Sequence, residues 1–175
     1  MPTEADFAKP RFITGGCLCG SLRYRIDFHD SHDFLGASGT CQCTQDRKAT
    51  GSLWLQYHKV TPPSKFTFTS PTTSLKHYNA SPGAARGFCG ECGSFLCWKP
   101  VEDTGRVTIS VGTVDSLYLF GEGADGKEVP EGGFGFALAN GGGDHEWCGN
   151  EIKGVTEGLS ILGHERGKRW DGDPE

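Results

Sequence analysis

The sequence predicts a mainly β protein with few short helices, and three observations support this. Short segments in which apolar and polar residues alternate recur about every ten residues, as is typical of strands. Turn-forming residues separate them: the 175 residues include 27 glycines and 9 prolines, about a fifth of the chain against a usual share of about 12%. Only one segment, residues 44–49, resembles a helix, so the pattern favours antiparallel sheets over βαβ units.

The strand candidates differ in strength. Residues 21–28 alternate apolar with charged side chains, which predicts a half-buried strand. The same alternation predicts strands over residues 53–60, 65–69 and 106–111. Shorter strand candidates are residues 74–78, 94–98, 117–120 and 134–139. Glycine-rich runs at 121–131 and 141–143 indicate loops.

The length suits one domain. We expect it to span residues 12–170, with loose termini at 1–11 and 171–175. The formal net charge of −5 and the lack of a long basic run argue against binding to nucleic acid or to a membrane surface. The first residues do not resemble a signal peptide, and no apolar stretch approaches the ~20 residues of a transmembrane helix. These features predict a soluble cytoplasmic protein.

The eight cysteines are the most informative feature. Six of them form three short pairs, namely Cys17 and Cys19, Cys41 and Cys43, and Cys89 and Cys92. In a reducing compartment such pairs bind metal ions more often than they form disulfides; a disulfide framework is the alternative for an exported protein. A closed zinc site needs four ligands. The residues alone therefore allow either one four-cysteine site with two spare thiols, or one closed site and one incomplete, open site.

Four motifs in the same order along residues 12–116 resemble a known family. They are GGCLCGSLRY at 15–24, CQC at 41–43 followed by Arg47, Lys48, Thr50 and Gly51, FCGECGS at 88–94, and VGTVD at 111–115. Together they resemble the glutathione-dependent formaldehyde-activating enzymes and centromere protein V. The resemblance implies a β-tent fold built around a structural zinc ion, with glutathione as a co-substrate. It also implies that Cys17, Cys19, Cys89 and Cys92 share the structural zinc.

The resemblance further implies a catalytic zinc held by three cysteines of a CxCxxC motif, and here the sequence departs from the pattern. Cys41 and Cys43 are present, but Asp46 stands where the third cysteine is expected. In one hypothesis Asp46 is a carboxylate ligand and a water takes the fourth position. In the other hypothesis the second metal is lost, and the two cysteines are small buried residues. An Asp46 that is not a ligand is placed to act as a base.

Other side chains are candidate participants in the chemistry. The glycine-rich approach to His145 and Cys148 allows two interpretations. The segment is either a polar loop with a half-buried Trp147, or it folds over the open zinc and supplies a base or a fourth ligand, for which His145 is the candidate. His58 and His77 are interpreted as ordinary surface or hydrogen-bonded histidines, and Cys97 as a small buried apolar residue.

The leading hypothesis for function is a zinc-dependent carbon–sulfur lyase-like enzyme. Its substrate would be a small carbonyl compound or a glutathione-type thiol adduct. One alternative is a non-catalytic, zinc-stabilised binding or scaffold module that has lost the second metal. Another is an enzyme that uses zinc-bound water as a hydrolase or isomerase on a specialised metabolite.

Overall fold

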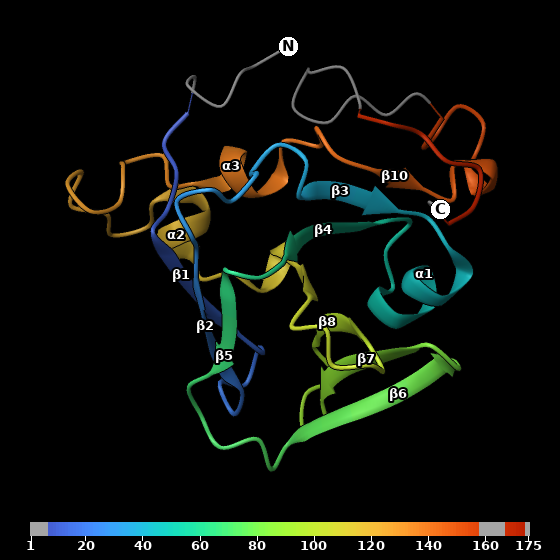
Figure 1. Ribbon diagram of the computed structural model, residues 1–175, viewed down its shortest axis with the longest axis horizontal. Helices are drawn as coiled ribbons and strands as arrows, with labels where there is room; N and C mark the ends of the chain where they lie inside the picture. The colour runs from blue at the N-terminus through green and yellow to red at the C-terminus, as the bar shows by residue number, and fades with distance from the viewer. Residues whose placement is uncertain (1–6, 158–166, 174–175) are drawn as a thin grey trace.

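A computed structural model describes residues 7–157 and 167–173, and within them ten strands form two sheets (Figure 1). The three-stranded sheet has the order β1-β2-β5, with bounds Phe12–Gly16, Arg23–Asp27 and Lys65–Phe68. The seven-stranded sheet has the order β10-β3-β4-β9-β8-β7-β6. Its bounds, in that order, are His145–Glu146, Ser38–Cys41, Leu55–Val60, Val107–Ser110, Phe95–Pro100, Ala84–Cys89 and Leu75–Ser81. Only β10 and β3 pair in parallel among these strands, so the predicted mainly β, antiparallel architecture is confirmed.

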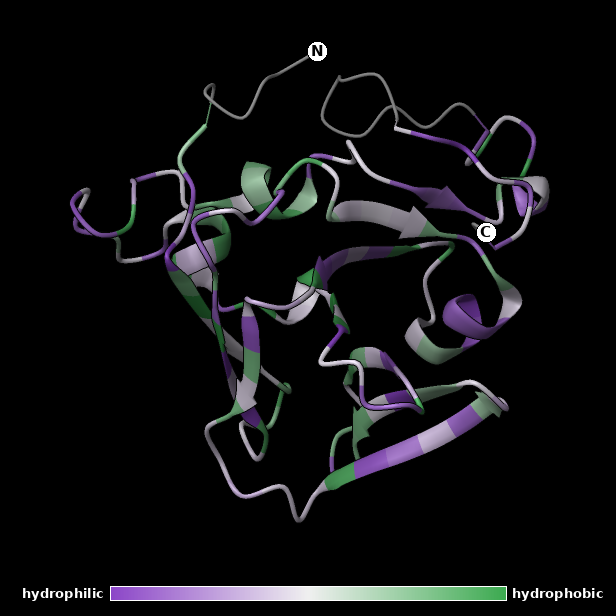
Figure 2. Ribbon diagram, viewed as in Figure 1, coloured by the Kyte–Doolittle hydropathy of each residue, from purple (hydrophilic) through white to green (hydrophobic). Residues whose placement is uncertain are grey.

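The main hydrophobic core lies between the two sheets. In β2, Tyr24 and Ile26 are fully buried while Arg23 and Arg25 are half-buried, as the alternation predicts. Both sheets and one helix contribute to this core, through Ile13, Tyr24, Ile26, Val60, Leu96, Ile109 and Leu138. At the edge of the larger sheet, β6 is hydrophilic along most of its length and largely exposed (Figure 2). A polar edge strand resists pairing with other chains.

Two of the predicted strands are wrong. Residues 117–120 lie in the helix α2 (Ser116–Phe120), and residues 134–139 contain the helix α3 (Gly135–Ala139). An apolar run of four or five residues does not distinguish helix from strand by its period. The helical signal in α2 is Gly121, which closes the helix with a left-handed φ of 81° and donates its N–H to the Leu117 carbonyl.

The predicted short helix at 44–49 is confirmed as α1 (Thr44–Thr50). The strands β1, β3 and β7 were not predicted, because small residues and glycine interrupt their alternation. The strand β10 was not predicted because its two residues are too few to show any alternation. None of the helices in the described ranges has the length and apolar content needed to span a bilayer.

The predicted single domain with loose ends stays a prediction. Residues 1–6 and 174–175 of those ends lie outside the described residues. Within the described parts, the Phe7 ring contacts the Phe136 ring with centroids 5.0 Å apart, and Trp147 Nε1 donates to Asp173 at 2.9 Å.

A buried histidine pair joins β4 to the segment between β2 and β3. His58 is fully buried, and its Nε2 lies 2.9 Å from Nε2 of His32 while its Nδ1 lies 3.2 Å from the Leu138 carbonyl oxygen. The rings of Phe28 and Phe34 pack around it. Burial, and then the charge of His32, lower the pKa of His58 to about 3.

This pair predicts a loss of stability in mild acid. In the unfolded chain His58 titrates near its ordinary pKa of about 6.5, so between pH 6.5 and 3 the unfolded state binds a proton that the folded state does not. His58 should therefore lower the free energy of unfolding by about 2 kcal/mol between pH 7 and pH 5. Urea unfolding at both pH values should show this loss shrinking in His58→Gln but unchanged in His29→Gln, which alters an exposed histidine. Equal pH slopes in the wild type and His58→Gln would contradict the assignment.

Candidate functional site

Two tight turns, one from each sheet, bring four cysteines together. Cys17 and Cys19 follow β1, whereas Cys89 ends β7 and Cys92 lies in the next turn. Their four sulfur atoms all lie within 4.8 Å of one another, and none is in a disulfide. The Cys17–Cys19 and Cys19–Cys89 sulfur distances are 3.5 and 3.8 Å. A tetrahedron with metal–sulfur distances of about 2.3 Å has edges of about 3.8 Å, so this four-cysteine cluster could hold a metal ion.

Local backbone geometry forms the two turns. Gly20 and Gly93 have left-handed φ values of 78° and 76°, and their N–H groups donate to the carbonyls of Cys17 and Cys89. The hydroxyl of Ser94 interacts with the Cys92 sulfur and lowers the pKa of Cys92 to about 5. Because one turn belongs to each sheet, an ion bound here would tie together strands that are 70 residues apart.

A second cluster lies where β3 leads into α1. Cys41 ends β3, Cys43 is the N-cap of α1, and Asp46 lies in its first turn. All three side chains are buried, and their ligand atoms lie within 4.8 Å of one another. The backbone N–H of Asp46 donates to the Cys43 sulfur at 3.2 Å, so the thiol that begins the helix also belongs to the cluster. The interaction between the two sulfurs raises the pKa of Cys41 and lowers the pKa of Cys43.

Asp46 has a partner that sequence reasoning missed. Arg86 of β7 donates to Asp46 Oδ1 from Nε at 3.1 Å and from Nη2 at 2.9 Å. Both side chains are 8% exposed, so this is a buried ion pair. The pair involves only one of the two carboxylate oxygens, and a carboxylate has lone pairs for further partners. Arg86 is the single charged residue in a strand that is otherwise small and apolar and that ends at Cys89. This charge in an apolar strand is the one sequence feature that could have indicated Arg86.

The register of the larger sheet builds a pocket beside this cluster. Arg86 is opposite Trp98, Trp98 is opposite Thr108, and Thr108 is opposite Lys59. Directly paired residues point to the same face of a sheet, so these four side chains form one row across β7, β8, β9 and β4. The row forms one wall of a cavity of about 320 Å³. Other walls include Cys41, Cys43 and Asp46, with Glu146 and Trp147.

The segment that contains His145 lines this pocket, but His145 itself does not. Its ring is fully buried, with Nδ1 2.7 Å from the Thr40 hydroxyl and Nε2 2.8 Å from the Gly141 carbonyl oxygen. The next residue, Glu146, lines the pocket instead and accepts a hydrogen bond from the Tyr57 hydroxyl at 2.8 Å. Burial raises the pKa of Glu146 above its ordinary value.

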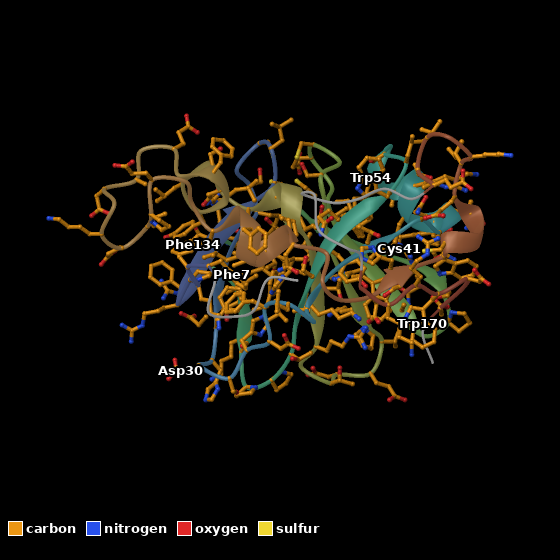
Figure 3. The ribbon with its side chains drawn as sticks, turned by 90° about the horizontal axis from the view of Figure 1, so that it is seen from above. Phe7, Asp30, Cys41, Trp54, Phe134 and Trp170 are labelled. Carbon is orange, nitrogen blue, oxygen red and sulfur yellow. The ribbon has the colours of Figure 1, made fainter. Side chains whose placement is uncertain are left out.

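Seen from above, Cys41 and Trp170 lie at the same end of the molecule, away from Phe7 and Phe134 (Figure 3). Trp170 Nε1 donates to Asp144 Oδ1 at 3.0 Å, and Asp144 also pairs with Lys59. The C-terminal residues 167–173 therefore lie beside the strand that carries Glu146.

One comparison with known proteins covers both clusters. Residues 12–125 match the family model described as "Glutathione-dependent formaldehyde-activating enzyme", a match that includes all seven clustered residues. A comparison with curated proteins finds no match. A crystal structure of a Rhodobacter sphaeroides protein aligns with a TM-score of 0.46 and 17% sequence identity, over 59% of this chain and 88% of that chain. Because the family match covers well over half of its length, the chain belongs to the family of glutathione-dependent formaldehyde-activating enzymes.

Proposed function

We propose that the protein is a zinc-dependent, carbon–sulfur lyase-like enzyme that acts on a small carbonyl compound or a glutathione-type thiol adduct. The observation that carries the proposal is the position of Cys41, Cys43 and Asp46, which lie together on the wall of a cavity of about 320 Å³. Ligand pockets for small molecules begin at about this size. The family match supports the same class of substrate.

The two clusters suit different roles. Cys17, Cys19, Cys89 and Cys92 form a four-sulfur set, which is the composition of structural zinc sites. Cys41, Cys43 and Asp46 form a set of three, which is typical of catalytic zinc because one position stays open for substrate. When bound there, zinc would act as a Lewis acid that polarises a carbonyl oxygen or favours the thiolate form of a thiol.

The chain's own residues provide the rest of the chemistry. To split a hemithioacetal, a base takes the hydroxyl proton, the carbonyl forms as the carbon–sulfur bond breaks, and the leaving sulfur keeps the electron pair and receives a proton. We assign Glu146 as the base that takes the hydroxyl proton, because it lines the pocket and its hydrogen bond with Tyr57 holds its orientation. Trp98 and Trp147 line the same cavity and limit the access of water.

One observation favours the non-catalytic alternative. Arg86 neutralises Asp46 without any metal ion, so the second cluster can remain ordered in a scaffold module that binds only the structural zinc. The two hypotheses differ in the number of metal ions that the chain retains.

The metal content separates these hypotheses. Elemental analysis of the purified protein should give two zinc ions per chain, and one in the double variant Cys41→Ser/Cys43→Ser, because the open site loses two of its three ligands. Cys97→Ala removes a buried thiol outside both clusters and should retain two. Turnover of a glutathione–formaldehyde adduct should disappear with the second ion. One zinc ion in the wild type, unchanged in the double variant, would refute the catalytic site.

A further inference from the structure

Three buried polar atoms around the pocket lack a hydrogen-bond partner. Among the residues that the structure describes, they are Nη1 of Arg86, Nε of Arg106 and the hydroxyl oxygen of Thr108. Arg86 is 6% exposed and Thr108 is 8% exposed. A buried donor without a partner costs about 1–3 kcal/mol. Three such groups in one place therefore indicate a ligand that satisfies them.

The three groups share one wall. Arg86 and Thr108 stand in the row of β7, β8 and β9, on either side of Trp98. Arg106 precedes Thr108 by two residues, and its guanidinium carbon lies 5.2 Å from the centroid of the Trp98 ring. All four side chains line the cavity that also contains the second cysteine cluster. The unpartnered groups therefore belong to side chains of the same wall as Trp98.

We infer that Arg86, Arg106 and Thr108 form a subsite for a carboxylate group of the substrate. The inference rests on the proposed function for the chemistry at Cys41, Cys43 and Asp46, and it adds the class of substrate: a small organic acid, or an adduct that carries one. Arg86 connects the second cysteine cluster with the carboxylate subsite. Its Nε and Nη2 donate to Asp46, while its Nη1 is left for the ligand. A carboxylate bound to Nη1 would thus place the rest of the molecule next to the cysteine cluster.

The chemistry of the wall favours a carboxylate. Two of the three groups are guanidinium donors, which accept no hydrogen bond and carry a positive charge, so they favour an anionic acceptor. A planar guanidinium also matches the two oxygens of a carboxylate. The cavity lining is balanced in formal charge, with Lys59, Arg86 and Arg106 against Asp46, Glu146 and Asp173. Three acidic side chains in the lining disfavour the second negative charge of a phosphate dianion, so the subsite suits a monoanion.

Binding of an acid and its amide tests the inference. Dissociation constants of 3-mercaptopropionate and 3-mercaptopropionamide are measured with the zinc-loaded full chain, through the fluorescence of the tryptophans that line the pocket. The acid should bind at least tenfold more tightly, as expected for charge-assisted hydrogen bonds. Thr108→Val and Arg106→Gln should each reduce this preference several-fold. Their matched controls, Thr67→Val and Lys153→Gln, change exposed residues outside the cavity and should leave it unchanged.

A second arm keeps this inference separate from the proposed function. Propionate and propionamide, which have no thiol, are compared in Cys41→Ser/Cys43→Ser, where the second metal is absent. A remaining preference for propionate that disappears in Arg106→Gln supports the carboxylate subsite, even if the zinc analysis refutes the catalytic metal. The inference is overturned if acid and amide bind equally, if the preference survives both subsite substitutions, or if inorganic phosphate binds more tightly than either acid.

Discussion

Cys89→Ser is expected to prevent the chain from folding to a soluble, ordered state. Cys89 is fully buried, and its sulfur lies 3.8 Å from that of Cys19 in the four-cysteine cluster. Structural zinc contributes about 10–16 kcal/mol in small zinc-binding peptides. A whole domain is stable by only about 5–15 kcal/mol. Without a zinc ion at this cluster the two sheets would lose the link between them, and the core that lies between them should not form.

The measurements are soluble yield, near-ultraviolet circular dichroism and zinc content. Cys97→Ser is the matched control, because Cys97 is a similarly buried thiol in β8 that belongs to neither cluster. This control should fold and retain its zinc. A strong chelator added to the wild type provides a second test, in which zinc release and loss of tertiary signal should occur together. A well-folded Cys89→Ser chain with a full complement of zinc would show that the ligand assignment is wrong.

Sequence patterns predicted the fold where the alternation was long enough to be distinctive. The strands β2, β4 and β5 follow from their alternation, and β2 buries the apolar face that was expected. β3, with the sequence SGTC, is fully buried but contains no large apolar residue, so no period reveals it. The apolar run of α2 is too short for the spacing of its apolar residues to distinguish a helix from a strand.

The residues that cluster at the candidate site were predictable from the sequence, but their surroundings were not. Spacing and motif placed Cys41, Cys43 and Asp46 in one cluster, and the structure brings them together. Arg86 is 40 residues from Asp46 and reaches it only through the pairing of β7 within the larger sheet. When side chains meet through the register of strands that are distant in sequence, no local pattern indicates which residues will be partners. For the same reason, Glu146 and not its neighbour His145 lines the pocket.

Arg86→Leu is expected to lower the free energy of unfolding by about 3–5 kcal/mol, because it leaves the buried Asp46 carboxylate without its partner. Adding Asp46→Asn to this variant should recover most of the loss, since the unpaired charge is then gone. Urea unfolding measures both effects. Arg169→Leu is the control: Arg169 pairs with Glu151 but is 44% exposed, and its loss should cost at most about 1 kcal/mol because solvent screens the pair.

The same variants decide whether Asp46 only forms the ion pair with Arg86 or also binds a metal ion. If Asp46 is a ligand, a bound cation compensates for part of the charge left by Arg86→Leu, so excess zinc should stabilise this variant and zinc content should stay at two per chain. Asp46→Asn should then lose one zinc ion, while Asp46→Cys, which gives the three-cysteine pattern of the family, should keep it. Should Asp46→Asn retain both ions and Arg86→Leu not respond to zinc, the carboxylate is only the partner of Arg86. The second cluster would then hold its ion through Cys41 and Cys43 without the carboxylate, whereas the scaffold hypothesis requires a single zinc ion in the wild type and in every variant of Asp46.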